Sequence, residues 1–210
     1  MVKYRAPLIL VLLGSYDPTT KRLLYSLKEE VVKAYAGSGV TVYAFILESL
    51  TVYELSNNSV LFLENIGERL FTAYFLVNGV LEDVIELKGE LNDVLLQVEN
   101  RYGVRVRRKV RELDKLRLLA DYPYSLLIFL REKELTRDGE YIELAYLVSR
   151  LRPEEVYKRA WFFKREGIPI STMVKELLTD FKIQYRTYSS DEELIEEVLR
   201  VLDSTLKTMK

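Results

Sequence analysis

The sequence predicts an α/β fold with a doubly wound, mainly parallel sheet and an antiparallel, hairpin-rich insertion or sheet extension at residues 48–88. Two observations predict this class. Continuous apolar runs, typical of strands buried on both faces of a parallel sheet, alternate with helical patterns at both ends of the chain. Residues 48–88 interrupt that alternation with paired apolar runs around turn residues. We expect residues 1–210 to form a single domain.

The beginning of the chain predicts a strand, a helix and a second strand. Residues 7–13 form a continuous apolar run that ends at Gly14, and residues 40–47 form another. Between them, Asp17 is a favoured N-cap residue, and Pro18 suits the first position of a helix. Apolar residues then recur at helical spacing. Such a unit predicts two parallel strands joined by a right-handed crossover.

Residues 48–88 predict antiparallel pairing. One pair of apolar runs flanks the Ser-Asn-Asn turn at residues 56–58. A second pair, within residues 71–87, flanks Asn78-Gly79, and Asn-Gly between apolar runs is the strongest short-range signal for a β-hairpin. The alternative is a continuous helix over residues 68–77.

The rest of the chain predicts further strands and helices. A helix over 91–102 ends at Gly103, and an alternating segment around Val104, Val106 and Val110 then becomes helical toward Ala120. A strand over 124–130, a helix over 140–150 and a helix from Pro153 that stops at Gly167 follow. The chain continues with a short strand over 168–170, a brief helix capped by Ser171 or Thr172, a strand over 183–188, and a final helix that begins with the capping box of Ser190 and Glu193.

The composition excludes several kinds of chemistry. The chain contains neither cysteine nor histidine, which removes disulfides, thiolate nucleophiles and the commonest metal ligands. We therefore expect no metal and no cofactor, so that any chemistry rests on carboxylates, tyrosines, lysines, hydroxyls or backbone dipoles. Few glutamines beside many Lys, Arg and Glu are typical of a thermophile. No apolar run approaches the ~18 residues of a membrane span, and no secretory signal is evident, so we expect a cytoplasmic protein without a membrane partner.

Charge is unevenly distributed along the chain. The net charge is −1, yet residues 101–120 carry eight cations and two anions, a net of +6. We interpret residues 101–117 as a solvated face, because charge runs mostly lie in solvent. The alternative is a segment that neutralises phosphates, but the rest of the chain is net acidic and would repel a long polyanion. Nucleic acid is therefore the least favoured partner.

In an open α/β sheet, ligands bind outside the carboxyl ends of the strands. Three segments are predicted to lie there: residues 14–17, 131–139 and 169–172. In the first, Gly14-Ser15-Tyr16-Asp17 leads into a helix N-terminus, whose free N–H groups attract anions. Because the Asp17 carboxylate already uses that end as a cap, a ribose hydroxyl suits this corner better than a phosphate. The alternative is a plain turn followed by a plain N-cap.

Residues 138–146 are the more informative stretch. Their helix is largely apolar, and Glu143 lies within it, one turn after Glu140. A partly buried glutamate beside a second carboxylate holds its proton more firmly than an exposed one, which suits a nucleophile or a proton-exchanging group. The alternative is a structural glutamate, paired with Arg150 or Arg137.

These stretches resemble nucleoside 2-deoxyribosyltransferases and the wider group of nucleotide-handling domains that includes the Toll/interleukin-receptor-like fold. In that layout a first strand ends in a small-residue turn, a later Asp precedes a buried strand, and a Gly-containing loop leads into a helix bearing Glu-Leu-Gly-Tyr-Ala. The corresponding stretches here are Gly14-Ser15-Tyr16, then Asp121 before the run 126–129, then Asp138-Gly139 leading into Glu143-Leu144-Ala145-Tyr146.

The resemblance implies that Glu143 is the nucleophile on the sugar C1′ and that Asp138 is a carboxylate that orients the substrate. The ligand-binding residues would be Gly14, Ser15, Tyr16, Asp17, Asp121, Gly139 and Glu140. The chain departs from the layout in three places: the Asp–Glu spacing is shorter by one residue, Ala145 replaces a glycine, and residues 48–88 and the basic segment have no counterpart.

The sequence thus predicts a flavodoxin-like α/β domain that binds a nucleoside or nucleotide, with transfer or hydrolysis of an N-glycosidic bond through a glycosyl ester of Glu143. The alternative is a non-enzymatic nucleotide sensor that signals as a homodimer, to which the basic segment and an aromatic helix over 153–166 are suited. The third hypothesis is a nucleic-acid-associated protein. Base release separates the first from the second, and salt-dependent binding to DNA or RNA would single out the third.

Overall fold

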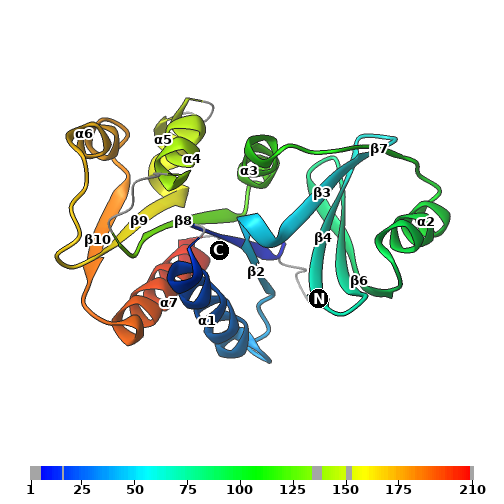
Figure 1. The fold of residues 1–210 in the computed structure, drawn as a ribbon, viewed down its shortest axis with the longest axis horizontal. Helices are drawn as coiled ribbons and strands as arrows, with labels where there is room; N and C mark the ends of the chain where they lie inside the picture. Colours follow the sequence, from blue (N-terminus) through cyan, green and yellow to red (C-terminus); the bar gives the residue numbers. More distant parts are fainter. Residues whose placement is uncertain (1–5, 16, 134–138, 150–152, 209–210) are drawn as a thin grey trace. The chain divides into compact units, whose positions relative to one another are not determined.

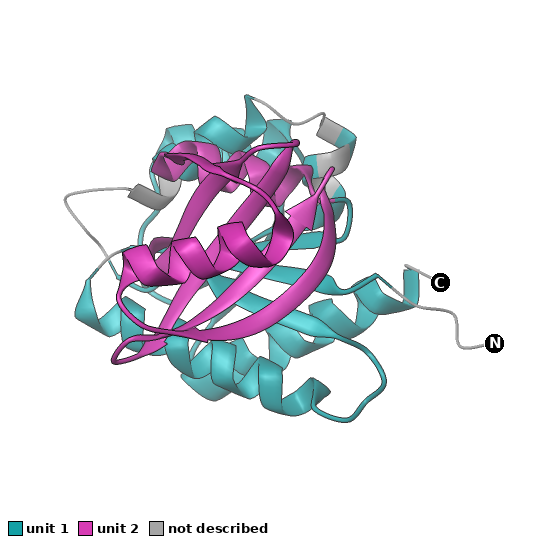
Figure 2. Cartoon of the chain, turned by 90° about the vertical axis from the view of Figure 1, so that its right-hand side faces the viewer, with its two compact units in different colours: residues 1–46, 123–210 teal, residues 47–122 magenta. Residues whose placement is uncertain are grey.

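The chain forms two compact units, described by a computed structural model that covers residues 6–15, 17–133, 139–149 and 153–208. Figure 1 shows the elements in sequence colours, and Figure 2 colours the first unit teal and the second magenta. The first unit comprises Met1–Ile46 and Pro123–Lys210, and the second comprises Leu47–Tyr122. The second unit is therefore inserted in the chain between the second and third strands of the first.

The first unit contains a parallel sheet of five strands. These are β1 (Leu8–Gly14), β2 (Val42–Ile46), β8 (Ser125–Arg131), β9 (Ala160–Arg165) and β10 (Gln184–Tyr188). The helices are α1 (Pro18–Tyr35), α4 (Gly139–Val148), α5 (Pro153–Arg159), α6 (Thr172–Asp180) and α7 (Asp191–Thr208). All neighbouring strands pair in parallel, in the order β10-β9-β8-β1-β2. The predicted α/β class with a mainly parallel sheet is confirmed.

The strand order reverses between β1 and β8. From β1 the chain crosses through α1 to β2 on one side, and after the insertion it returns to β8 on the other side of β1. In doubly wound sheets such a reversal leaves a crevice outside the carboxyl ends of the two strands. This reversal, the switch point of the sheet, lies beside Gly14 and the end of β8.

Helices cover both faces of this sheet, with α1 and α7 on one side and α4 and α5 on the other (Figure 1). Leu8, Leu10 and Leu12 of β1 belong to the same buried cluster as side chains of α1 and α7. The intervening residues of β1 are equally buried, and α4 packs against β1 and β8. Because successive strand residues point to opposite faces, this double coverage explains the continuous apolar run.

The second unit contains an antiparallel sheet of five strands in the order β6-β5-β4-β3-β7. The strands are β3 (Leu50–Leu55), β4 (Ser59–Gly67), β5 (Leu70–Val77), β6 (Val80–Lys88) and β7 (Val106–Lys109). A short 3-10 helix, η1 (Leu47–Ser49), precedes them, and α2 (Leu91–Tyr102) and α3 (Glu112–Asp121) complete the unit. The unit thus extends beyond residues 48–88, because α2 packs in its core, β7 pairs with β3 in its sheet and α3 contacts η1.

The hairpin at Asn78-Gly79 is confirmed. Val77 pairs with Val80, and both turn residues have positive φ, 51° at Asn78 and 77° at Gly79, as a type I′ turn requires. The alternative of a helix over residues 68–77 is wrong, because β5 occupies that segment. This strand pairs on both sides, with β4 and with β6.

The predicted helix from Pro153 to Gly167 is wrong in its second half. The helix α5 ends at Arg159, and β9 follows at once. The aromatic run Trp161-Phe162-Phe163 is too short to distinguish the helical period of about 3.6 residues from the strand period of two. Its pairing with β8 and β10 makes it a strand. The predicted strand over 168–170 is also wrong, since those residues lie in the loop between β9 and α6.

Candidate functional site

The end of β1 is tightly packed around Gly14. Gly14 lies opposite Leu130 of β8. A Cβ atom at Gly14 would lie 3.0 Å from Thr20 Cγ2 and 3.3 Å from the Leu130 carbonyl oxygen. Glycine therefore suits this position because of close packing rather than because of an unusual backbone angle. This packing brings the start of α1 against the switch point.

Asp17 caps α1, as the sequence predicts. Its Oδ1 atom accepts hydrogen bonds from the backbone amides of Thr19 and Thr20, at 3.0 and 3.2 Å. Its Oδ2 atom accepts from the hydroxyls of Ser15 and Thr20, the latter at 2.5 Å. The buried Ser15 hydroxyl also lies 3.2 Å from Thr20 Oγ1. The small polar side chains of this turn are thus arranged around one carboxylate.

Lys133, two residues beyond the end of β8, completes this arrangement. Its ammonium lies 2.7 Å from Asp17 Oδ1, and its side chain is 40% exposed whereas that of Asp17 is 13% exposed. Burial opposes ionisation of Asp17, but the hydrogen bonds from Lys133, Ser15 and Thr20 outweigh it and hold the pKa of Asp17 well below its usual range. Asp17 is therefore charged at neutral pH, and Lys133 is the exposed member of the pair.

A second polar cluster joins the carboxyl ends of β8, β9 and β10. Arg165 donates to Glu132 Oε1 at 2.7 Å and to the Ser189 carbonyl at 3.2 Å, and it pairs with Asp191. The Tyr188 hydroxyl donates to Glu132 Oε2 at 2.6 Å. Burial, together with this bond to Glu132, raises the pKa of Tyr188 far above its usual value. These groups are hydrogen-bonded to one another, so the cluster links the carboxyl ends of the three strands.

Glu143 is buried in α4, with 6% of its surface exposed. The helix starts shortly after the carboxyl end of β8 and packs on β1 and β8. Glu143 lies four residues into it, or about 6 Å along the axis from its start. Its neighbours Leu144 and Leu147 are also buried. The predicted burial of this carboxylate within an apolar helix is confirmed.

The other predicted site residues are distributed as follows. Tyr16 and Asp138 lie outside the described residues. Gly139 is the first residue of α4, and Glu140 follows it. Asp121 is exposed at the end of α3, in the second unit, and precedes β8 rather than following it. The structure therefore brings Gly14, Ser15 and Asp17 together at the end of β1.

Sequence reasoning assigned no role to Lys133, Glu132 or Arg165. Lys133 and Glu132 belong to residues 131–139, one of the segments predicted at the carboxyl ends of the strands. Charged residues directly follow the apolar run of β8, and this pattern could have indicated both as candidate site residues. Arg165 carries no such signal, because the sequence predicts a helix over residues 153–166 rather than a strand that ends at this edge.

The basic segment of the second unit is largely neutralised by its own carboxylates. The ion pairs join Arg101 to Asp83, Arg105 to Glu99, Arg108 to Glu54, Arg111 to Asp114 and Lys115 to Glu112. The four arginines of these pairs are exposed, as expected of a solvated face, whereas Lys115 is buried.

Comparisons with known proteins add no family. No protein-family model matches the sequence, and no curated protein is significantly similar to it. Within the described ranges, no helix is long and apolar enough to cross a membrane. The same residues contain no group of three or more carboxylates placed to hold a metal ion.

Proposed function

We propose that the first unit is a flavodoxin-like domain that binds a nucleotide outside the carboxyl ends of β1 and β8. Counted along the chain, its strands take the spatial order 2-1-3-4-5. Flavodoxin-like doubly wound domains have this order and bind their ligand at the corresponding reversal. The observation that carries the proposal is the Asp17–Lys133 ion pair, which lies at that reversal.

Lys133 is the group that meets the ligand. An ammonium has three donors, and Asp17 accepts from one of them, so the exposed remainder is available to a phosphate. Asp17 itself accepts from two backbone amides, two hydroxyls and Lys133, which fills the roughly four lone-pair positions of a carboxylate. A ribose hydroxyl would therefore have to displace one of these donors. Asp17 orients Lys133, and Lys133 binds the phosphate.

A glycosidic reaction at Glu143 is the narrower proposal, and the burial of this carboxylate near the start of α4 supports it. The Glu143 carboxylate would attack C1′, the bond from C1′ to the base nitrogen would break, and the departing base would take a proton from water. Water would then hydrolyse the glycosyl ester, which regenerates the carboxylate and returns a proton to the solvent.

Calorimetric titration with AMP tests the binding site. Lys133→Gln should weaken AMP at least tenfold, because a hydrogen bond to a charged group is lost. Lys33→Gln is the matched control, since Lys33 is an exposed lysine near the far end of α1, and it should bind AMP as the wild type does. Equal AMP affinity in Lys133→Gln and wild type would refute the site.

Release of free base from nucleosides, followed by chromatography, separates the enzyme from the sensor. Glu143→Gln should abolish release while AMP still binds. AMP binding without any base release by the wild type would instead support a non-enzymatic nucleotide sensor.

A further inference from the structure

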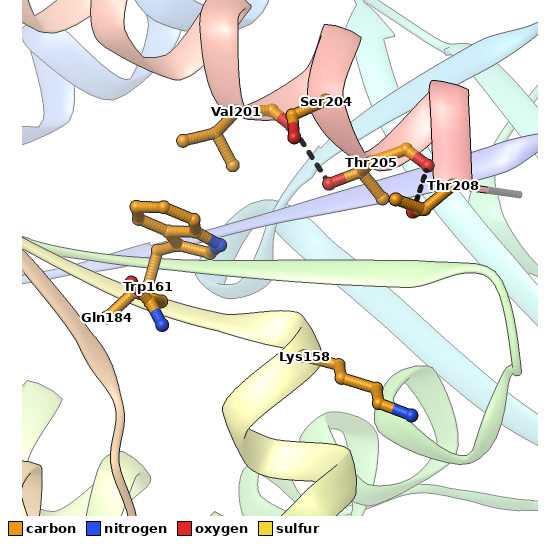
Figure 3. A pocket seen from close by; sticks show the side chains of 7 residues that line it. All are labelled: Lys158, Trp161, Gln184, Val201, Ser204, Thr205 and Thr208. Atoms are coloured by element: carbon orange, nitrogen blue, oxygen red, sulfur yellow. Dashed lines mark hydrogen bonds between the residues drawn. The ribbon is translucent and has the colours of Figure 1, made fainter.

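A pocket of about 430 Å³ lies near the amino ends of β9 and β10, whereas the switch point lies at the carboxyl ends of the parallel strands. This volume is within the usual range for small-molecule sites. The residues that line it are Lys158, Trp161, Gln184, Val201, Ser204, Thr205 and Thr208 (Figure 3). They come from the end of α5, the starts of β9 and β10, and the last turns of α7.

Two neighbouring side chains contact the indole ring of Trp161. The guanidinium of Arg186 lies 5.1 Å from the centre of the indole ring, and the ring of Phe163 stacks at 6.2 Å. Arg186 is in turn paired with Glu197 of α7. These contacts hold the ring in position, and the edge that carries its nitrogen is turned toward the space between α7 and the Lys158 side chain (Figure 3). A ring fixed in this way binds a ligand at little entropic cost.

Several polar groups of the pocket have no hydrogen-bond or ion-pair partner within the described part of the chain. They are the Lys158 ammonium, the Trp161 indole N–H, the Gln184 amide and the Ser204 hydroxyl. The other two hydroxyls are already used, because Thr205 donates to the Val201 carbonyl and Thr208 to the Thr205 carbonyl, both at 2.8 Å (Figure 3). The available groups are therefore mainly donors.

The described lining of the pocket carries a formal charge of +1. Lys158 carries the one formal charge among the described lining residues, and none of them is a carboxylate. An ammonium with neutral N–H and O–H donors around it matches an anion of one charge, whereas a phosphate monoester carries nearly two at neutral pH. The half-buried indole of Trp161 supplies apolar surface beside these donors.

We propose that this pocket binds a small organic monocarboxylate with an apolar body. The carboxylate accepts from Lys158, with the Trp161 N–H and the Gln184 amide as further donors. The hydrocarbon part lies along the half-buried indole of Trp161. The site is separate from the proposed nucleotide site, since the two lie at opposite ends of the parallel strands.

Tryptophan fluorescence tests this directly, because Trp161 is the only tryptophan of the chain. Benzoate and hexanoate, one aromatic and one aliphatic carboxylate, should each change the emission in a saturable way. Benzamide, the neutral counterpart of benzoate, should bind about tenfold more weakly, because it lacks the charge that Lys158 recognises. No saturable change with either carboxylate, or equal affinity for benzoate and benzamide, overturns the proposal.

Variants identify the cation. Lys158→Gln should weaken benzoate about tenfold in the same assay. The matched control is Lys175→Gln, an exposed lysine in the first turn of α6, and its affinity for benzoate should equal that of the wild type. Unchanged affinity in Lys158→Gln would refute the proposal. Lys133→Gln should keep benzoate binding and Lys158→Gln should keep AMP binding, so the two proposed sites stand or fall separately.

Discussion

The Lys133 ammonium lies 2.7 Å from Asp17 Oδ1, and this contact joins the segments that follow β8 and β1. Asp17 acts in two ways at once, as the N-cap of α1 and as the partner of the exposed lysine. The local signal of a helix start therefore coincides with the point at which the strand order reverses. The start of α1 and the position of the Lys133 side chain are thus linked through this carboxylate.

Asp17→Asn should lower the free energy of unfolding at pH 7 by about 1–2 kcal/mol, because asparagine still caps a helix but cannot form the ion pair. The folded-state pKa of Asp17 is depressed, so its contribution is present above pH 4 and is lost as the pH falls further. Urea unfolding at pH 7 and at pH 3 should show the difference between wild type and variant shrinking in acid. A difference that is constant with pH would contradict this assignment.

Tyr102→Phe should remove a contribution to the free energy of unfolding that the wild type loses at high pH. Tyr102 stacks on Phe75 with ring centroids 4.0 Å apart and donates to Asp83 at 2.7 Å. Burial, and then this bond to Asp83, raises the pKa of Tyr102 to about 12. A raised folded-state pKa stabilises the second unit below about pH 10, the usual value for tyrosine, and the contribution is lost as the pH rises toward 12. Denaturant unfolding at pH 8 and pH 11 should show the wild type losing its advantage over the variant. An advantage that persists unchanged at pH 11 would be evidence against the Asp83 bond.

Lys115→Met should destabilise the second unit by about 1–3 kcal/mol. Lys115 is 2% exposed, and its ammonium donates to the carbonyls of Leu47 and Leu50 at 3.2 and 2.7 Å. Methionine keeps most of the volume but leaves both carbonyls without this donor. Lys109→Met, at an exposed position on β7, is the control and should change the unfolding free energy by less than about 0.5 kcal/mol. Similar effects of the two substitutions in thermal or urea unfolding would remove the proposed role of Lys115.

Nucleic acid should bind weakly or not at all. The ion pairs of residues 101–115 already occupy most cations of the basic segment. Each phosphate neutralised contributes roughly −0.9 to the slope of log affinity against log salt for duplex DNA, so we expect a shallow slope. Titration of labelled duplex and single-stranded oligonucleotides at several salt concentrations measures it. Submicromolar binding at physiological salt with a steep slope would make nucleic acid the leading partner instead.

Local signals in the sequence predicted those features whose cause lies within a few residues. The cap at Asp17, the turn at Asn78-Gly79 and the helix end at Gly103 all appear where expected. Each depends on a short-range hydrogen bond or on a positive φ that few residues tolerate. The burial of Glu143 was likewise visible, because helical spacing alone places it among apolar neighbours.

The sequence by itself determined the α/β class, the antiparallel pairing of residues 48–88 and the polar turn after β1. Only the tertiary structure decided that Ala160–Arg165 is a strand, that the strand order reverses between β1 and β8, and that Lys133 meets Asp17. The physical reason is that these features depend on pairing between segments far apart in the chain. A run such as Trp161-Phe162-Phe163 satisfies a helix or a strand locally, and the hydrogen bonds offered by β8 and β10 select the strand.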